Sequence, residues 1–466
     1  MPNHNVIIGG GPVATNAVET IRQFDDGASR ITLVSDEPAH SRMALPYWLA
    51  GQIARDHTMT ADDAYYAKLK VEPRIGVRAT KLDPQGKSVT LSDGSPLGFD
   101  NLLIATGSSA IPLPVPGADL PGVQSLWTLA HTESVLDSVN GKPDPSVVMI
   151  GSGFIGFIML NAMNKRGWKL AVVEREPHVL PRMLNADAAG IVEKWLGTKG
   201  IELHCGTTVS EIRESGSAKS VVLANGQSLP ADIVIIATGV QPNVDLVKGT
   251  DIKFEEGPTG GIYVNDRMQT NHPFIYAGGD VAKGPALFSA QPTIHGIQPT
   301  AVDHGRIAGA VMAGQDATYP GSLSMNVLDI CGLQCASFGN WSDSSAQAMT
   351  ISNAKENIFR TLLWTGEQLT GAIFVGAAND MGMLTDVGMV KGLMQTQTDL
   401  GQWKTFLAEN PFDIRRPYVA TKVAQKLVST TLLGRPSQPR QFQFKGTQLQ
   451  EAVGEAHAVF VGEKKG

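Results

Sequence analysis

Two glycine-rich segments have the spacing that a dinucleotide pyrophosphate requires, and each follows an apolar run. The first is Gly9-Gly10-Gly11-Pro12-Val13-Ala14, after residues 6–8, and the second is Gly151-Ser152-Gly153-Phe154-Ile155-Gly156, after residues 147–150. Glycine lets backbone N–H groups approach phosphates, and a helix that begins there adds the positive end of its dipole. One such loop arises often by chance. Two of them predict two dinucleotides in one chain, and therefore electron transfer between them.

The elements around these loops predict a domain organisation. Residues 5–35 and 147–174 each read as strand, loop, helix and strand, which is the opening of a Rossmann domain. Buried strands ending in Ala-Thr-Gly follow in each domain, and the chain returns to the first domain at residues 274–280. From about residue 321 the pattern becomes hairpin-like. We predict an α/β fold with two Rossmann-like domains, residues 1–115 with 245–320 and residues 116–244, then an α+β domain (321–410) and a polar, poorly periodic extension (411–466).

The composition excludes several classes of protein. A net charge of -6 gives no sign of nucleic-acid binding. Three cysteines are too few for a disulfide framework or a four-cysteine cluster, so we expect a reducing compartment and no metal site. No signal peptide precedes the first strand, and no run of about 18 apolar residues could span a membrane. We therefore expect a soluble, cytoplasmic protein with no membrane span.

The order of the motifs resembles the pyridine nucleotide–disulfide oxidoreductase superfamily. Within it, the chain is similar to the branch of NADH oxidases, rubredoxin and ferredoxin reductases, and nitrite reductase flavin subunits. The segments at residues 41–47 and 270–280 carry most of this resemblance, which extends from residue 5 to about residue 410. It implies two glutathione-reductase-type domains, the first for FAD and the second for NAD(H). It also implies a homodimer that forms through the C-terminal domain.

The resemblance assigns an FAD site to the first domain. Asp36 stands near the end of the second strand for the adenosine ribose, with Glu37 as an alternative; Asp36 could also simply begin the turn before Pro38. The helix that begins near Pro299 would stabilise negative charge on reduced flavin, unless this helix start is purely structural. The expected FAD-binding residues are Gly9, Gly11, Pro12, Ala14, Asp36, Arg42, Ala105, Thr106, Gly107, Asp280, Pro299 and Thr300.

The second loop predicts a nicotinamide dinucleotide site. Glu174 closes the following strand, where a carboxylate accepts hydrogen bonds from ribose hydroxyls and repels the extra phosphate of NADPH. NADH is therefore the preferred donor, although Arg175 next to Glu174 leaves NADPH open, and the loop could also have lost its ligand. The expected NAD-binding residues are Gly151, Gly153, Phe154, Ile155, Gly156, Glu174 and Gly239.

The chain departs from the family pattern near the flavin. Met43 stands where thiol-dependent members carry the redox cysteine, and a thioether cannot form a thiolate, so thiol chemistry at that position is excluded. Ile158 and Tyr47 stand where relatives place a glutamate and a lysine, and we assign both to the nicotinamide and flavin face. Tyr47 could gate the nicotinamide by stacking, or both could be ordinary core residues.

Other polar side chains are expected to be structural. Cys331 and Cys335 would face each other across a hairpin and contribute to packing. His295 and His304 would lie near the flavin helix, each as a helix-surface residue or, alternatively, as an acid or base.

The sequence thus predicts an FAD-dependent NAD(P)H:acceptor oxidoreductase. Hydride would pass from NADH to flavin N5, and electrons would continue to a redox protein or a small acceptor that the sequence does not identify. The alternative is a flavin-holding electron-transfer subunit of a larger complex with little turnover on its own.

Overall fold

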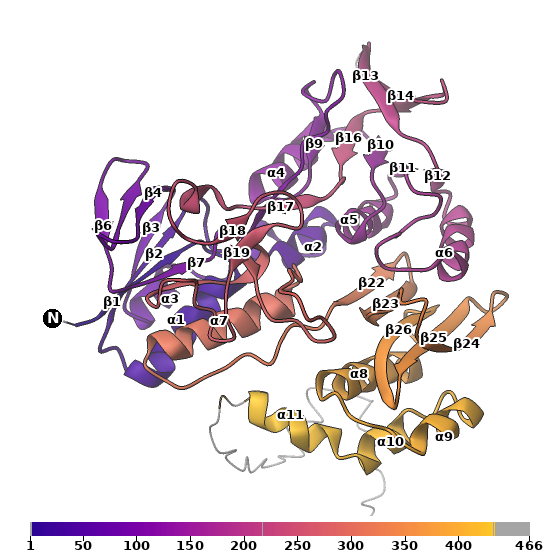
Figure 1. The fold of residues 1–466 in the computed structure, drawn as a ribbon. Helices are drawn as coiled ribbons and strands as arrows, with labels where there is room; N and C mark the ends of the chain where they lie inside the picture. The colour runs from indigo at the N-terminus through magenta and orange to yellow at the C-terminus, as the bar shows by residue number, and fades with distance from the viewer. Residues whose placement is uncertain (1, 217, 432, 434–466) are drawn as a thin grey trace, which may run out of the picture.

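The first domain contains a five-stranded parallel sheet. The computed structural model describes residues 2–216, 218–431 and 433 (Figure 1). Four strands of this sheet are buried at their centres, as expected of a parallel sheet covered on both faces, whereas the edge strand at residues 71–75 is mostly exposed. Their order is β20 (Ile275–Ala277), β7 (Asn101–Ile104), β1 (His4–Ile8), β2 (Arg30–Ser35) and β3 (Val71–Ile75). The chain therefore returns, through β20, to the sheet that it began.

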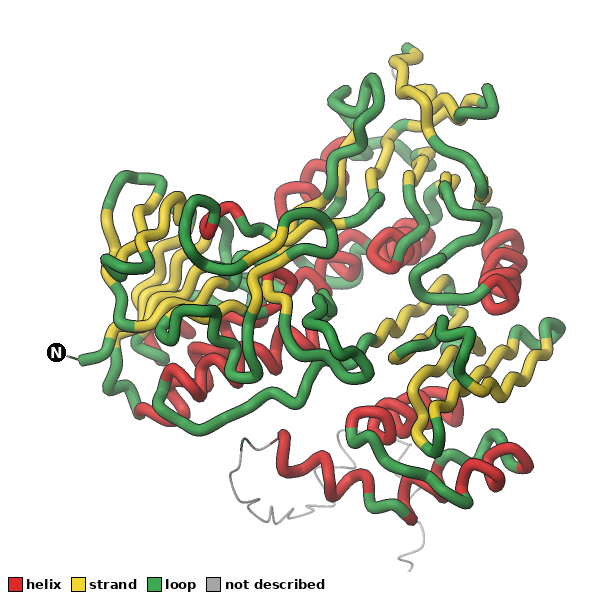
Figure 2. The backbone as a smooth tube through the Cα atoms, viewed as in Figure 1, coloured by secondary structure: helices red, strands yellow, loops and turns green. Residues whose placement is uncertain are grey.

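Two long helices of this domain, α1 (Pro12–Asp25) and α7 (Gln298–Met312), lie side by side (Figure 2). A methyl group at Gly305 of α7 would lie 2.4 Å from the carbonyl oxygen of Val13. Only glycine allows this close approach. The contact fixes the start of α7 relative to the first glycine loop.

The second domain repeats this plan. Its parallel sheet has the order β12 (Glu202–Cys205), β11 (Lys169–Glu174), β10 (Ser146–Ile150), β16 (Ile233–Ile236) and β9 (Val123–Ser125), and its helices are α4 (Leu129–Ser138), α5 (Phe154–Lys165) and α6 (Ala186–Thr198). The strands β8 (Ser108–Ala110) and β17 (Val240–Pro242) pair as the chain crosses between the domains. Thr106 and Asn243 also exchange two hydrogen bonds of 2.8 Å each at this crossing.

Smaller elements complete both domains. Three-stranded sheets contain β4 (Ala79–Asp83), β5 (Ser88–Leu91) and β6 (Pro96–Gly98); β13 (Val209–Ser215), β14 (Ala218–Leu223) and β15 (Ser228–Ala231); and β18 (Phe254–Glu255), β19 (Gly261–Tyr263) and β21 (Ala282–Lys283). Two short helices, α2 (Leu45–Leu49) and α3 (Asp63–Lys68), follow β2.

The third domain is an antiparallel sheet with helices, so the expected α+β architecture is confirmed. The sheet order is β22 (Met325–Ile330), β23 (Leu333–Gly339), β26 (Gln368–Ala377), β25 (Ile358–Thr365) and β24 (Gln347–Asn353). Some of its apolar side chains, such as Phe374, share a core with α8 (Met381–Gln395). Others, such as Leu328 and Phe359, share a core with residues of α5 and α6.

The hairpin between β22 and β23 corrects one expectation. Cys331 and Gly332 form its turn, with φ of 53° and 91°, which is the geometry of a tight two-residue hairpin. Cys335 lies opposite Leu328, so the two cysteines do not face each other. Because Cys331 lies in the turn, it has no partner residue on the opposite strand.

Two helices lie in the segment from about residue 411, whose sequence is polar and poorly periodic. α10 (Arg415–Ala420) and α11 (Val423–Thr431) follow α9 (Trp403–Glu409) and pack against α8. With only six residues, α10 is too short for a clear apolar period. Pro417 is tolerated because it lies in the first turn of α10, where no N–H is needed. The rest of the predicted extension, residues 434–466, lies outside the described residues.

One ion pair is buried beneath these helices. Arg360 of β25 donates to the carboxylate of Asp386 of α8 at 2.7 Å and to the carbonyl oxygen of Pro411 at 2.7 Å. The side chains of the pair are only 5% and 12% exposed. Burial raises the pKa of the Asp386 carboxyl, and the neighbouring guanidinium acts in the opposite direction.

Replacing Arg360 by methionine should therefore destabilise the third domain strongly. The variant leaves a buried carboxylate without its partner, which costs about 3–5 kcal/mol. Urea unfolding at neutral pH measures this loss, and the double variant Arg360→Met/Asp386→Leu should recover most of it. A single variant with an unchanged unfolding midpoint would contradict this account.

Candidate active site

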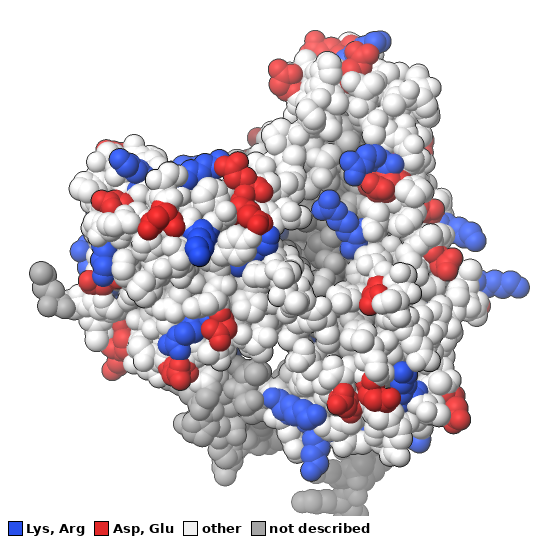
Figure 3. All heavy atoms as spheres, in the orientation of Figure 1, with Lys and Arg blue, Asp and Glu red and all other residues white. Residues whose placement is uncertain are grey.

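A cavity of about 2130 Å³ lies where the three domains meet. Figure 3 shows the molecular surface hollowed between two lobes, with basic side chains on the wall of the hollow. Pockets for a single drug-sized ligand measure about 300–1,000 Å³, so this cavity has room for more than one. The lining comes from the second glycine loop, from the segment before and at the start of α7, and from β22 and α8.

The second glycine loop forms one wall of the cavity. Gly151 has a φ of 101°, and a methyl group there would lie 2.4 Å from the carbonyl oxygen of Ala237. Gly153 caps α5 without any side-chain hydrogen bond, and a methyl group on it would meet nothing within 4 Å. The backbone is therefore open toward the cavity, as a pyrophosphate requires. Gly156, Phe154, Ile155 and Gly239 also line the cavity.

The first glycine loop has the same construction. Gly9 has a φ of 120°, and a methyl group there would lie 2.1 Å from the carbonyl oxygen of Ala105. Gly11 caps α1 without a side-chain bond and is likewise open. Ala14, at the third position of the motif, is fully buried.

The structure gathers the other predicted FAD residues of this region at one edge of the sheet. Ile8 pairs with Val34 and with Ile104, so the segments that follow β1, β2 and β7 lie together at the carboxyl ends of parallel strands. Among the described residues that line the cavity, eight of the predicted FAD-binding residues are missing, namely Gly9, Gly11, Pro12, Ala14, Asp36, Ala105, Thr106 and Gly107.

Asp36 directly follows β2, as its predicted ribose role requires. Its side chain is 50% exposed and forms an ion pair with Arg78. An exposed pair of this kind contributes little and exchanges readily for another partner. The role of Asp36 stays a prediction.

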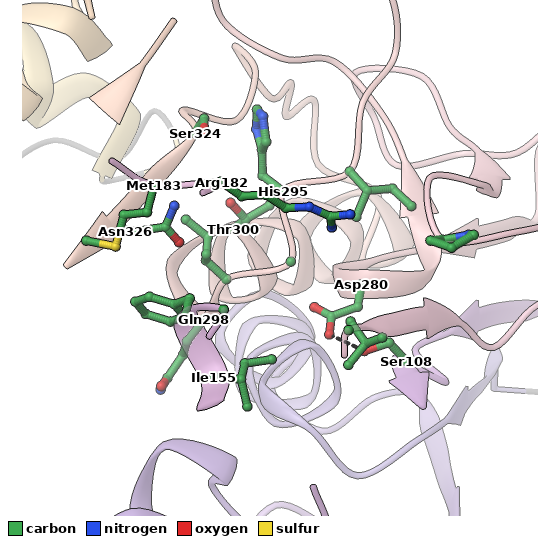
Figure 4. A pocket seen from close by; sticks show the side chains of 18 of the residues that line it. Ser108, Ile155, Arg182, Met183, Asp280, His295, Gln298, Thr300, Ser324 and Asn326 are labelled. Carbon is green, nitrogen blue, oxygen red and sulfur yellow. Dashed lines mark hydrogen bonds between the residues drawn. The ribbon is translucent and has the colours of Figure 1, made fainter. Parts of the chain in front are cut away.

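Asp280 and the start of α7 form the wall that faces the second loop. Asp280 Oδ2 accepts a hydrogen bond of 2.7 Å from the hydroxyl of Ser108 (Figure 4), a residue that the sequence did not single out. Pro299 and Thr300 line the cavity, and no side chain caps α7. The positive end of this helix therefore opens on the cavity, where it favours negative charge.

His304 corrects the expectation of a helix-surface residue. Its side chain is 3% exposed, and burial lowers its pKa to about 4, so the ring is neutral. The backbone N–H of Gly279 donates to His304 Nδ1 at 3.2 Å, which places the proton on Nε2 and holds the turn before Asp280. The spacing could have shown this, because Ala301, His304 and Ala308 share one face of α7.

His295 lies in the cavity rather than on a helix. It precedes α7 (Figure 4). Its Nδ1 lies 2.6 Å from the hydroxyl of Ser322. Burial lowers the pKa of its ring.

The residues that depart from the family pattern lie at different depths. Arg42, Met43 and Ile158 line the cavity, and the Arg42 guanidinium stacks over Trp127, 4.5 Å from the ring centroid. Tyr47 is 53% exposed and is not among the lining residues, so its interpretation as a core residue is wrong. The helix α2 buries other positions instead, because its five residues have one inward face. Gating by Tyr47 stays a prediction.

Glu174 lines the cavity at the end of β11. It is 8% exposed, and its carboxylate accepts hydrogen bonds from Ser152 and from the backbone N–H of Glu176. The sequence placed Glu174 at this strand end but did not reveal its partner Ser152.

Thiol and metal chemistry find no support among the described residues. Burial raises the pKa values of Cys205 and Cys331 to about 11 and that of Cys335 further, so all three thiols are protonated at neutral pH. No group of three or more histidine, cysteine or acidic side chains in the described part of the chain could hold a metal ion. No described helix has the length and apolar character needed to cross a membrane.

Two dinucleotide-type loops, the second of which lines an interdomain cavity together with Asp280 and the start of α7, define a class of two-nucleotide oxidoreductases. The family model of the pyridine nucleotide-disulphide oxidoreductases matches residues 3–315. The chain belongs to this family. Its members hold FAD and NAD(H), and the open backbone of both glycine loops fits these dinucleotides.

Three relatives illustrate the range of similarity. The NADH-dependent phenylglyoxylate dehydrogenase subunit epsilon of Aromatoleum evansii is 27% identical over 88% of this chain and 96% of its own length. The NADH oxidase of Methanocaldococcus jannaschii is 30% identical over 72% and 75%. The structure of an NAD-dependent persulfide reductase from A. fulgidus matches with a TM-score of 0.77 and 27% identity, covering 86% and 78%. With further relatives named as ferredoxin and nitrite reductases, they confirm the expected branch.

Proposed function

We propose that the protein is an FAD-dependent NADH:acceptor oxidoreductase. The observation that carries this proposal is the cavity itself, onto which the NAD-type loop, Asp280 and the start of α7 all open. FAD held in this site would supply the redox chemistry that couples the oxidation of NADH to the reduction of an acceptor. That acceptor is a small redox protein or a small molecule.

The chain's own residues bind and orient the two nucleotides. Gly9 and Gly11 would receive the FAD pyrophosphate, and Asp280, held by Ser108, would bind its ribitol. Gly151 and Gly153 would receive the pyrophosphate of NADH. Phe154, Ile158 and Met43 supply an apolar wall that limits water around the reacting rings.

Anaerobic mixing with NADH tests this function. We expect the purified protein to be yellow and its flavin absorbance to fall rapidly after mixing with NADH, and more slowly with NADPH. Dithionite gives the fully reduced reference. Protein that stays colourless after incubation with excess FAD would contradict the proposal.

A second candidate is a flavin-holding subunit of a larger complex. It is favoured by the relative from Aromatoleum evansii, which is named as a subunit and is matched over 96% of its length. In that case flavin bleaching and turnover should require an added partner. Rapid bleaching and steady turnover of the isolated chain with ferricyanide would exclude it.

We also propose a cytoplasmic homodimer that forms through the C-terminal domain. Three large apolar side chains are well exposed in this part of the chain, namely Met381 in that domain and Phe412 and Val419 just after it. The three cysteines are free thiols. A monomer in light scattering, or recovery of the protein outside the cytoplasm, would contradict these points.

We also propose that the chain divides into an FAD domain, an NAD(H) domain and an interface domain, with boundaries at residues 115, 244 and 320.

A further inference from the structure

We propose that Ser152 is a positioning residue that fixes the carboxylate of Glu174 and thereby sets the preference for NADH over NADPH. This inference rests on the proposed function, because it concerns the nucleotide that the second loop would bind. Ser152 is the second residue of that loop and is completely buried.

The hydrogen bonds of Ser152 connect the second glycine loop to the carboxylate of Glu174 and to the backbone of Leu180. Its backbone N–H donates to Glu174 Oε2 at 2.8 Å, and its hydroxyl donates to the same oxygen at 2.6 Å. The backbone N–H of Leu180 approaches the hydroxyl oxygen of Ser152 at 3.3 Å and its carbonyl oxygen at 3.2 Å. A hydroxyl has one proton, and Ser152 donates that proton to Glu174. The oxygen of the same hydroxyl accepts the contact from the N–H of Leu180.

Three donors converge on the Glu174 carboxylate. The third is the backbone N–H of Glu176, which donates to Oε1 at 2.9 Å. A carboxylate offers roughly four acceptor positions, so about one remains for a ribose hydroxyl. The bonds also prevent the charge from turning away from an incoming 2′-phosphate.

Arg175 does not offset this charge in the structure. Its guanidinium donates to Glu176 Oε1 at 2.9 and 3.2 Å, and the side chain is 75% exposed. An exposed ion pair of this kind holds Arg175 only weakly. The buried charge of Glu174, which Ser152 holds in place, is therefore the fixed feature of this site.

The test uses nucleotide fragments that carry no nicotinamide. ADP-ribose and 2′-phospho-ADP-ribose are titrated into the FAD-loaded protein by calorimetry, so no redox step enters the measurement. In Ser152→Ala, the discrimination against the 2′-phosphate should fall about tenfold. Ser337→Ala is the matched control, because Ser337 is buried and its hydroxyl has no hydrogen-bond partner.

A double-variant cycle separates positioning from general damage. If Ser152 acts through Glu174, Ser152→Ala should have almost no further effect in a Glu174→Gln background. An equal effect in both backgrounds, or unchanged discrimination in Ser152→Ala, would overturn the inference. Ser152→Thr retains the hydroxyl and should discriminate nearly as the wild type does; a loss equal to that of the alanine variant would also overturn it.

The same titration distinguishes the two levels of failure. Wild-type protein that binds neither fragment would refute the nucleotide site, and with it the proposed function. Wild-type protein that binds ADP-ribose while Ser152→Ala discriminates normally would refute only the role of Ser152. The flavin absorbance of each variant shows whether it has folded and retained FAD.

Discussion

Gly9→Ala should purify as a colourless protein that cannot be loaded with FAD. At a φ of 120°, a methyl group would lie 2.1 Å from the carbonyl oxygen of Ala105. That carbonyl cannot move freely, because the N–H of Ala105 is bonded to the carbonyl oxygen of Ile8 at 2.8 Å. The backbone strain alone costs about 1–3 kcal/mol. We therefore expect FAD affinity to fall on the order of a hundredfold or more.

The measurement is the amount of flavin released from a known amount of denatured protein, before and after incubation with FAD. Gly98→Ala in the same domain is the control. The nearest atom to a methyl group at Gly98 is the carbonyl oxygen of Lys87, at 3.9 Å. If Gly9→Ala retained as much FAD as this control, the first loop would not be the flavin site.

Gly151→Ala should have the complementary phenotype, a yellow protein whose flavin NADH hardly reduces. A methyl group at Gly151 would lie 2.4 Å from the carbonyl oxygen of Ala237, at a φ of 101°. The second loop would have to move away from the position in which its N–H groups meet a pyrophosphate. Flavin reduction at low NADH should slow about a hundredfold, since about 2.8 kcal/mol of strain and lost contacts corresponds to that factor.

Stopped-flow mixing with NADH measures this rate, and dithionite should still bleach the flavin completely. Gly190→Ala in α6, where a methyl group meets nothing within 4 Å, is the control in the same domain. Two results would count against the proposed division of labour. One is normal reduction by NADH, and the other is loss of FAD from a variant altered only in the second domain.

Much of the fold could be predicted because its signals are local. Each glycine loop lies directly between a buried strand and a helix, so a few neighbouring residues specify it. Glu174 could be placed at the end of β11 for the same reason. The return of the chain to the first sheet was also predictable, because residues 274–280 keep a recognisable pattern.

Other features depend on contacts that no local pattern encodes. The exposure of Tyr47 follows from which face of a five-residue helix is buried. The turn at Cys331 places Cys335 opposite Leu328 instead of opposite Cys331, and the helices α10 and α11 pack against α8 and against each other.

The sequence by itself determined that two dinucleotide loops exist and what kind of ligand each suits. It could do so because the steric freedom of glycine is a property of single residues. Only the tertiary structure decided that His304 is buried beneath Gly279, that Ser108 holds Asp280, and that Ser152 fixes Glu174. These bonds join residues 22 to 172 positions apart, and such pairs meet only after the sheets and helices have packed.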